Sequence, residues 1–328
     1  MKVWQINEVG DPWTHLSIGE VALPTAPKGV CRIEVEAVDL NFADILQCQG
    51  SYQEKLDTPF TPGMNAVGKV IEVGENSGHA VGDRIIGPTY KGFGGYAEEC
   101  FIPGRRATGL DDEVDPIKAA AMHVTYGTAW FGLHLRGNLK PGETVLVLAA
   151  AGGVGAAAVE LAKVHGCWVV AAAGGAEKTN ACLQMGADEV VDYNSEDLYE
   201  KVMSLTDGRG VDVVYDPVGA HYFDMARRLV AWEGRYLIIG FAAGTIPSAP
   251  MNHALVKNYS LVGVHMGGYR GRDDKPFDDC YRELYAMLME DRISPLVDAV
   301  VGFDQLPEML QRLANRQSKG RIVFAPGR

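Results

Sequence analysis

Two hydrophobic patterns divide the chain near residue 121. Before that point, apolar and polar residues alternate in short runs, as at 30–37 and 67–73, and glycine-containing turns such as Gly82-Asp83 separate these runs. Alternation with a period of two is typical of strands that bury one face and expose the other. We therefore expect residues 1–121 to form a twisted, barrel-like β domain.

From residue 122 onward, buried strands alternate with helices. The expected buried strands occur at 144–149, 167–173, 189–192, 211–215, 236–240 and 259–264. Such strands, joined by helices, indicate an α/β fold of the Rossmann type, with a doubly wound parallel sheet.

Three helices outside the first βα units are also expected. One covers 195–205, where Asn194 or Ser195 provides an N-cap and acidic residues follow in the first turn. The others lie near 276–291 and 305–315, and a short strand at 321–324 follows them. This tail is too short for a domain of its own, so we expect it to complete the first domain.

A glycine-rich turn, Ala150-Ala-Gly-Gly-Val-Gly155, follows the first buried strand of the second region. Strand, turn, helix and second strand come in the order of a phosphate-binding βαβ unit. Glycines let a pyrophosphate approach the backbone, and the helix N-terminus offers free N–H groups. The first position is Ala150 instead of glycine, and an ordinary tight turn is the alternative. The complete βαβ pattern favours dinucleotide binding.

The end of the second strand indicates which dinucleotide binds. NAD sites place an Asp or Glu there to accept a hydrogen bond from the ribose 2′-OH. Residues 172–175 read Ala-Ala-Gly-Gly, with Lys178 close behind and no acid before Glu177. A nearby ammonium without a carboxylate favours a 2′-phosphate. We therefore predict that NADPH binds. The alternative is that Lys178 is simply a solvated residue in the first turn of the next helix.

Composition limits the classes of partner. With 328 residues, the chain exceeds what one hydrophobic core usually supports. Its net charge is −12, and its longest basic clusters are Arg105-Arg106 and Arg227-Arg228. These features predict no binding to nucleic acid or to an anionic membrane.

The N-terminus and the cysteines indicate a cytoplasmic protein. Residues 1–8 lack the apolar core of a signal peptide, and the glycines within 144–162 argue against a membrane span there. The six cysteines are scattered without C-x-x-C spacing, which is typical of reduced thiols and offers no zinc knuckle.

An ordered set of short motifs resembles a known family. It comprises Asn41-Phe-Ala-Asp44, Gln49-Gly-Ser-Tyr52, Thr61-Pro-Gly63, Gly82-Asp-Arg84, Gly94-Gly-Tyr-Ala-Glu98, Thr125-Tyr-Gly-Thr-Ala129, Ala150–Gly155, Met185-Gly-Ala-Asp188, 210–216, Gly234-Arg235 and 320–323. In this order they resemble the zinc-independent medium-chain dehydrogenase/reductase superfamily, in its zeta-crystallin-like NADPH:quinone oxidoreductase branch. The resemblance covers nearly the whole chain.

The resemblance implies a fold and a domain order. A GroES-like β-barrel domain would comprise residues 1–121 and a return segment at 267–328, and a Rossmann NADP-binding domain would comprise 122–266. It also implies a homodimer. The zinc-dependent members bind catalytic zinc at positions that match Asn41, Met64 and Ala121, which are not zinc ligands. We therefore expect no metal.

The resemblance also assigns residues to the site. It implies Tyr52, Asn41 and Asp44 as the catalytic set beside the nicotinamide and the substrate. The implied cofactor contacts are Asn41, Tyr52, Thr125, Gly152, Gly153, Val154, Gly175, Lys178, Tyr193, Phe241, Met266 and Arg321.

Several of these residues have structural alternatives. Asp44 is equally expected to cap the helix around Ile45, and Phe241 and Met266 are as suited to packing as to binding. Arg321 also fits a surface or ion-pair role. His123 is excluded from the catalytic set, because a lone histidine is more often a hydrogen-bonded structural residue.

Three functions remain open. The leading hypothesis is hydride transfer from NADPH to a quinone, because quinones accept electrons readily and demand no dedicated acid. The nearest rival is a reductase of 2-enoyl-thioesters or enones, in which Tyr52 would donate to a developing enolate. The third is an NADPH-binding protein with a largely structural role.

Overall fold

The computed structural model describes residues 1–270 and 272–328. The chain forms two compact units. The first unit comprises Met1–Val124 and Pro295–Arg328, and the second comprises Thr125–Ser294. The second unit thus extends past residue 266, where we expected the Rossmann domain to end. The reason is that helix α9 (Lys275–Met289) packs inside it, with the Phe277 ring 4.9 Å from that of Phe131.

The first unit is built mainly from strands. They are β1 (Lys2–Ile6), β2 (Leu16–Glu20), β3 (Val30–Asp39), β4 (Asn65–Val73), β5 (Arg84–Pro88), β6 (Glu99–Pro103), β7 (Thr108–Leu110), β14 (Val297–Val301) and β15 (Arg321–Phe324). The main sheet runs in the order β14-β15-β3-β4-β5-β7, and β6 pairs with β3. Because β15 pairs antiparallel with β3, Val323 opposite Asp39, the C-terminal segment completes this sheet.

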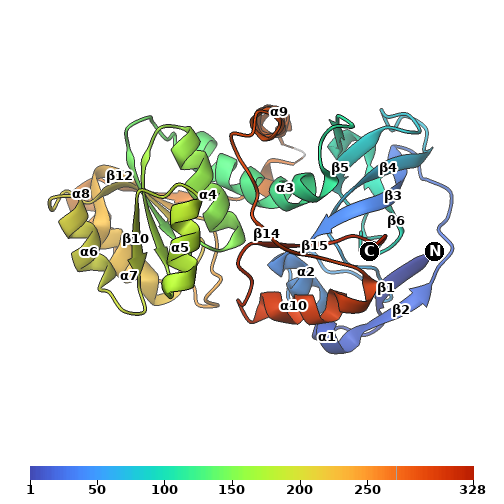
Figure 1. Ribbon diagram of the computed structural model, residues 1–328, viewed down its shortest axis with the longest axis horizontal. Helices are drawn as coiled ribbons and strands as arrows, with labels where there is room; N and C mark the ends of the chain where they lie inside the picture. Colours follow the sequence, from blue (N-terminus) through green and yellow to red (C-terminus); the bar gives the residue numbers. More distant parts are fainter. Residues whose placement is uncertain (271) are drawn as a thin grey trace. The chain divides into compact units, whose positions relative to one another are not determined.

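Three helices and two short turns accompany these strands: α1 (Pro12–His15), α2 (Phe42–Cys48), α10 (Leu306–Ala314), η1 (Gly104–Arg106) and η4 (Phe303–Gln305). Helix α10 lies beside α1 and α2 (Figure 1). Its buried Leu306 and Leu310 join Ile33, Tyr96 and Phe324 in one hydrophobic core. This core fixes the loop that connects β3 to α2.

The second unit contains a parallel sheet in the order β10-β9-β8-β11-β12-β13. The strands are β8 (Thr144–Leu148), β9 (Trp168–Ala173), β10 (Glu189–Asp192), β11 (Val211–Asp216), β12 (Val230–Ile238) and β13 (Ser260–Gly263). This order is that of a Rossmann sheet, and its topological switch lies between β8 and β11. Ligands of such sheets bind outside the carboxyl ends of the strands there.

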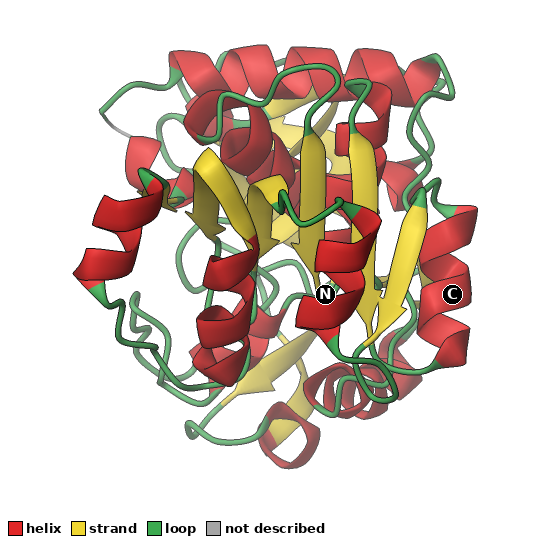
Figure 2. Ribbon diagram, turned by 90° about the vertical axis from the view of Figure 1, so that its left-hand side faces the viewer, coloured by secondary structure: helices red, strands yellow, loops and turns green. Residues whose placement is uncertain are grey.

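Helices cover both faces of this sheet. In Figure 1, α4 (Gly153–Val164) and α5 (Ala176–Gln184) lie on one side, and α6 (Leu198–Leu205), α7 (Ala220–Leu229) and α8 (Met251–Lys257) lie on the other. Figure 2 shows the strands enclosed by helices from a second direction. The unit also holds η2 (Phe131–Arg136), η3 (Met266–Tyr269) and α9, and the division between the units falls within α3 (Pro116–Trp130).

Two sequence-based expectations about these elements were wrong. Helix α6 begins at Leu198 with Asp197 as N-cap, whose side chain accepts from Glu200 N at 3.0 Å. Asn194 and Ser195 instead belong to a turn in which Asp192 Oδ1 accepts from Asn194 N at 3.0 Å. Strand β12 begins at Val230, earlier than 236, because its first residues pair with the start of β11.

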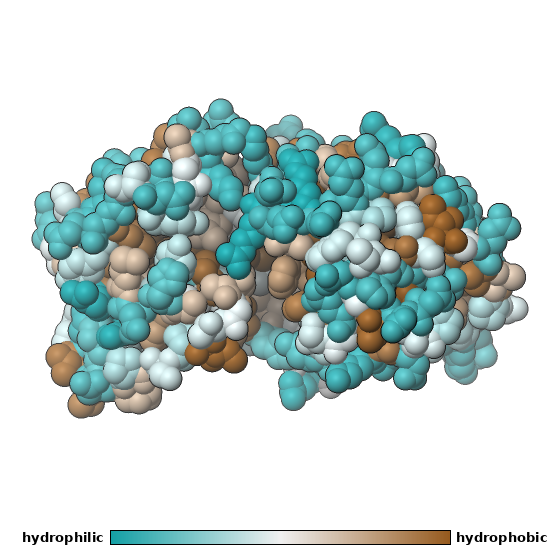
Figure 3. Space-filling view, turned by 90° about the horizontal axis from the view of Figure 1, so that it is seen from below, coloured by the Kyte–Doolittle hydropathy of each residue, from teal (hydrophilic) through white to brown (hydrophobic). Residues whose placement is uncertain are grey.

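No helix in the described part of the chain is long and apolar enough to cross a bilayer. On the face that Figure 3 shows, hydrophilic residues predominate and apolar residues form small separate patches.

Candidate functional site

The glycine-rich turn connects β8 to α4 by a close approach of backbone. Ala149 adopts a left-handed conformation with φ of 48°, and its carbonyl accepts from Gly152 N at 2.9 Å. A Cβ at Gly155 would lie 2.3 Å from the same carbonyl oxygen. Only glycine at 155 therefore lets the helix start this close to the end of the strand.

The turn leaves the helix N-terminus open for an anion. Gly152 is the exposed N-cap of α4, and Gly153 and Val154 form its first turn. N–H groups in a first helical turn have no intrahelical acceptor, and the helix dipole places positive charge there. A side chain at 152 would occupy the approach, which glycine keeps clear. These residues fit the pyrophosphate of a dinucleotide.

The ends of β9 and β10 bring Gly175 and Tyr193 together. Gly175 has φ of 92°, and its N–H donates to Asp192 Oδ1 at 2.8 Å. A Cβ at Gly174 would lie 2.8 Å from the ring of Tyr193. Lys178 stands in the first turn of α5, where its N–H donates to the Gly175 carbonyl at 3.1 Å. A lysine, a tyrosine and two glycines thus surround the place where the adenosine ribose binds in Rossmann sheets.

Asp192 is the residue of this region that sequence reasoning missed. Its Oδ1 accepts from both Gly175 N and Asn194 N, and these backbone hydrogen bonds lower the pKa of the carboxyl below its usual value. The carboxylate therefore holds the Gly175 loop in its left-handed conformation. The available signal was the acid at the end of the predicted strand 189–192, which is too common a pattern to single out.

The remaining predicted cofactor residues of the second unit lie in two places. The Sδ of Met266, at the start of η3, lies 3.3 Å from the Cβ position of Gly127 in α3, and Thr125 is buried one half-turn earlier. Phe241 follows β12, is 39% exposed, and places its ring 2.8 Å from the Cβ position of Gly219. Both Met266 and Phe241 therefore have packing roles, which leaves their role as ligand contacts a prediction.

In the first unit, Asn41 and Asp44 form a capping box at the start of α2. Asp44 Oδ2 accepts from Asn41 N at 2.8 Å and from the Tyr96 hydroxyl at 3.0 Å, and Oδ1 accepts from Met64 N at 2.9 Å. Asp44 is fully buried. This geometry favours the capping role that the sequence left open for Asp44, and its place in the catalytic set stays a prediction.

Burial also affects the pKa of Asp44. It raises the pKa of the carboxyl to about 6, against the opposing effect of the backbone hydrogen bonds from Asn41 and Met64. Because the backbone N–H groups of Asn41 and Met64 both donate to the Asp44 carboxylate, Asp44 positions these two residues, which lie far apart in the sequence.

Arg321 lies in β15 beside the same loop. It donates through Nε to Asp39 Oδ1 at 2.9 Å, and through Nη2 to Asp39 Oδ2, the Leu40 carbonyl and Asn41 Oδ1, the last two at 2.8 Å. Arg321 is 9% exposed and Asp39 1%. Burial raises the pKa of Asp39 to about 7 in spite of the attraction of Arg321. The ion-pair role left open for Arg321 is thus present.

This network fixes the side-chain amide of Asn41. Oδ1 accepts from Arg321, and Nδ2 donates to the Asp39 carbonyl at 3.0 Å. An amide nitrogen carries two hydrogens, so one N–H of Asn41 is left for another acceptor. A fixed donor of this kind suits a ligand carbonyl oxygen.

Tyr52 follows α2 and is half-buried. Its backbone N–H donates to the Leu46 carbonyl at 3.1 Å, which fastens it to the helix that Asn41 begins. Burial, and then the charges of Asp44 and Glu54, raise the pKa of its phenol. Tyr52 therefore keeps its proton at neutral pH and can act as a hydrogen-bond donor.

The three positions expected to replace zinc ligands are Asn41, Met64 and Ala121. Asn41 and Met64 meet at Asp44, and Ala121 is fully buried in α3, as is His123 two residues later. Within the described residues, no group of three or more His, Cys, Asp or Glu side chains is suited to a metal ion.

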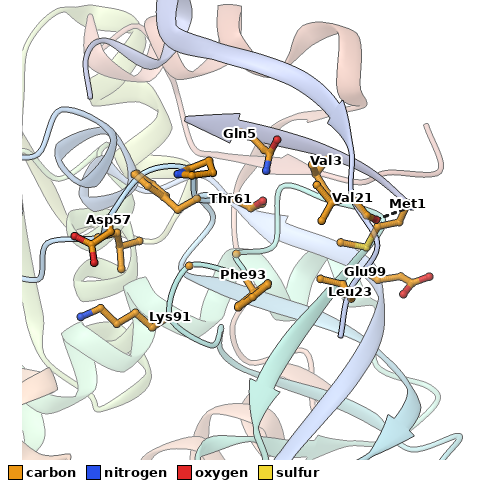
Figure 4. Close-up of a pocket in the computed structure, with 15 residues that line it drawn as sticks. Met1, Val3, Gln5, Val21, Leu23, Asp57, Thr61, Lys91, Phe93 and Glu99 are labelled. Atoms are coloured by element: carbon orange, nitrogen blue, oxygen red, sulfur yellow. Dashed lines mark hydrogen bonds between the residues drawn. The ribbon is translucent and has the colours of Figure 1, made fainter. Parts of the chain in front are cut away.

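One pocket of the first unit, of about 330 Å³, is lined by β1 and the loop around Lys91. In Figure 4, Asp57 and Lys91 lie at one end of it and Met1 and Leu23 at the other. Another pocket of this unit, of about 480 Å³, includes Gln47 and Met64 and therefore adjoins the Asn41–Asp44 network.

Comparison with known families matches both units. The family model "Alcohol dehydrogenase GroES-like domain" matches residues 27–112, and the model "Zinc-binding dehydrogenase" matches residues 153–283. Among curated relatives, quinone oxidoreductase-like protein 2 of Bos taurus is 40% identical over 304 residues, covering 92% of this chain and 86% of that protein. A homologue from Nematostella vectensis is 38% identical over 296 residues, covering 89% and 80%.

Solved structures agree. Mycobacterial Rv1454c in complex with NADPH has a TM-score of 0.89 and 30% identity, covering 99% of this chain and all (100%) of that one. The quinone oxidoreductase of Thermus thermophilus, also solved with NADPH, has a TM-score of 0.85 and 31% identity, with coverage of 99% and 100%. The predicted fold class is thereby confirmed, and the chain belongs to the medium-chain dehydrogenase/reductase superfamily, as an oxidoreductase of its zinc-independent, quinone oxidoreductase-like branch.

Proposed function

We propose that this oxidoreductase transfers a hydride from NADPH to a quinone without a metal ion. The observation that carries the proposal is the end of β9, where Gly174 and Gly175 with Lys178 replace the acid of NAD sites. The names of the relatives, among them quinone oxidoreductases solved with NADPH, support the same assignment.

In the second unit, we assign the backbone of Gly152, Gly153 and Val154 to the pyrophosphate, because N–H groups at a helix start have no acceptor within the helix. Gly175, Lys178 and Tyr193 are assigned to the adenosine 2′-phosphate. Thr125, Phe241 and Met266 are assigned to the nicotinamide end.

In the first unit, we assign Asn41 and Tyr52 to the reacting groups. NADPH supplies the hydride when it is bound. Asn41 holds one N–H ready for a quinone oxygen, because Arg321 and the Asp39 carbonyl occupy its other groups. That donor stabilises negative charge as it develops on the oxygen, and it costs no reorganisation. The reduced quinone then takes its protons from solvent, so no buried acid is needed.

Reduction of a 2-enoyl-thioester or enone is the second candidate. One observation favours it: the hydrogen bond from Tyr52 N to the Leu46 carbonyl, at 3.1 Å, holds Tyr52 against the helix that Asn41 begins, and its phenol is able to donate to an enolate oxygen. The two candidates use the same residues but differ in how strongly turnover depends on the Tyr52 hydroxyl.

We also propose a homodimer in a reducing compartment, the cytoplasm. Strand β13 pairs with β12 and forms an edge of the sheet, and Met251, Leu255 and Val256 of the adjacent α8 are 70%, 78% and 71% exposed. An open edge next to apolar side chains suits pairing with a second copy. All six cysteines are free and buried, which suits a reducing compartment. Sedimentation of the purified protein tests the dimer.

The test of the function is NADPH oxidation with a panel of quinones, enones and enoyl-thioesters, measured by the absorbance of the reduced nicotinamide. The proposal predicts the highest kcat/KM with quinones. Faster turnover of enoyl-thioesters would make the second candidate the function, and no turnover of any acceptor would refute both.

A further inference from the structure

The pocket of about 480 Å³ in the first unit is a groove. Its lining includes Gln47 and Met64 and, from two segments joined by the hydrogen bond from Gly104 N to the Gly29 carbonyl, Lys28, Arg105 and Arg106. We take these two groups as the two ends of the groove. Met64 donates its N–H to Asp44, so the first end adjoins Asn41, the proposed donor to the acceptor carbonyl. A molecule in this groove would therefore have its reactive carbonyl near Met64 and its remote part near the arginines.

The lining of the groove is strongly cationic. Lys28, Lys91, Arg105 and Arg106 line it, against the single acid Glu54. The two lysines are already balanced, because Lys28 lies 3.2 Å from Glu75 and Lys91 3.8 Å from Glu54. Arg105 and Arg106 have neither an ion pair nor a side-chain hydrogen bond to any of the described residues. Their charges are therefore available to a ligand.

The arginines on the other strands and helices of this unit are paired with acids. Each of the four contacts a carboxylate, namely Arg32, Arg84, Arg312 and Arg321. The chain carries 42 acidic against 30 basic residues, so acidic partners are plentiful. Two neighbouring guanidinium groups left without one indicate a site for an external anion, which guanidinium binds through two parallel hydrogen bonds.

The backbone holds these arginines in place. They belong to η1, where Gly104 N donates to the Gly29 carbonyl at 2.9 Å and a Cβ at Gly104 would lie 1.9 Å from the Ser77 carbonyl oxygen. The Arg106 carbonyl oxygen lies 3.1 Å from the Cβ position of Gly87 in β5. Just beyond β5, Thr89 N donates to the Met64 carbonyl at 2.9 Å. The end of β5 and the residues just after it therefore contact both Arg106, at one end of the groove, and Met64, at the other.

We propose that Arg105 and Arg106 bind an anionic group on the far end of the electron acceptor. The acceptor is then an elongated carbonyl compound whose tail carries a carboxylate or a phosphate. This inference rests on the proposed function, because it takes the acceptor to react at the Met64 end. It names the substrate class that this function leaves open.

Two matched pairs of acceptors test the inference. The first pair is a 1,4-benzoquinone with a carboxyl-terminated alkyl chain and its methyl ester, which have the same reactive ring. The second is crotonyl-coenzyme A and the N-acetylcysteamine thioester of the same acyl group, which lacks the phosphates. The parent protein is compared with Arg105→Gln/Arg106→Gln, and Lys69→Gln serves as a control, because Lys69 is an exposed cation of β4 outside the groove.

We expect the parent to prefer the anionic member of at least one pair by about tenfold in kcat/KM, as for two partly exposed charge contacts. The double variant should lower this ratio to near one, the control should keep it, and added salt should reduce it in the parent. A preference in the first pair assigns the anion as a carboxylate, and one in the second as a phosphate. A ratio near one for both pairs in the parent, or an unchanged ratio in the double variant, overturns the inference.

Failure of the proposed function gives a different result. If no acceptor oxidises NADPH, the function is refuted, and calorimetric binding of the quinone acid and its ester to the parent then decides the inference. Tighter binding of the acid that the double variant loses supports the anion site by itself. Equal binding of acid and ester overturns it.

Discussion

Removal of the Arg321 guanidinium, as in Arg321→Met, should lower the free energy of unfolding, because Asp39 is then buried without its partner. The side chain of Asp39 is 1% exposed and that of its partner Arg321 10%. Loss of one partner from a buried ion pair leaves an uncompensated charge and costs about 3–5 kcal/mol. The variant also loses the hydrogen bonds to Leu40 O and Asn41 Oδ1, each worth about 1 kcal/mol.

The loss should depend on pH. Asp39 has a pKa of about 7 in the folded protein, above its usual value of 3.8, so its protonated form is favoured by folding. Its contribution to stability is therefore complete below its unfolded pKa and is lost as pH rises through about 7. Without Arg321 the folded pKa rises further. We expect the full loss of about 3–5 kcal/mol at about pH 8 and mainly the hydrogen-bond loss at about pH 5.

Urea unfolding of parent and variant at both pH values measures this difference. The control is Arg312→Met, which breaks a partly exposed pair with Asp298 and should cost at most about 1 kcal/mol. Asp39→Leu combined with Arg321→Met should recover most of the stability, because no charge is left buried. An equal loss at the two pH values, or a double variant less stable than Arg321→Met, would show that the buried charge of Asp39 is not the cause of the loss.

Three further predictions concern the site. Lys178→Ala should raise the KM for NADPH by about 10- to 100-fold and leave the use of NADH nearly the same, because one charge-assisted phosphate contact is lost. Equal effects on both cofactors in steady-state kinetics would count against this prediction. Tyr52→Phe should lower kcat with quinones by less than about tenfold, whereas a loss of about 100- to 1,000-fold would mark an oxyanion donor and favour enoyl reduction. Dialysis against a strong chelator should change neither turnover nor melting temperature, because Asn41, Met64 and Ala121 offer no zinc ligands. Stoichiometric zinc in the purified protein, with activity lost on its removal, would contradict this prediction.

The sequence predicted the second unit well because its signals are local. Each buried strand is followed within a few residues by its turn and helix. In the Gly152–Gly155 segment, a Cβ at Gly155 would clash with the Ala149 carbonyl oxygen, so the need for glycine is itself local. The error at the start of α6 arose because several neighbouring residues could serve as its N-cap, and the sequence does not show which of them does. Asp197 rather than Asn194 caps α6, because Asp192 already binds the Asn194 N–H.

The network around Asn41 could not be predicted in the same way. Arg321 and Asp39 lie 282 positions apart, and Tyr96 and Asp44 lie 52 apart, so only the folded sheet shows that they meet. The motif gave Asn41 and Asp44 the same expected role. Their burial and hydrogen bonds distinguish Asn41, the proposed ligand donor, from Asp44, which caps α2.

We propose that the end of β9 selects NADPH for metal-free quinone reduction. The most direct measurement is the ratio of kcat/KM for NADPH to that for NADH, with one neutral quinone as acceptor. We expect a ratio of at least about 10, because Lys178 would contact the 2′-phosphate and β9 ends without an acid. A ratio of one or below would contradict it, and would indicate that Asp192, beside Gly175, repels the 2′-phosphate instead.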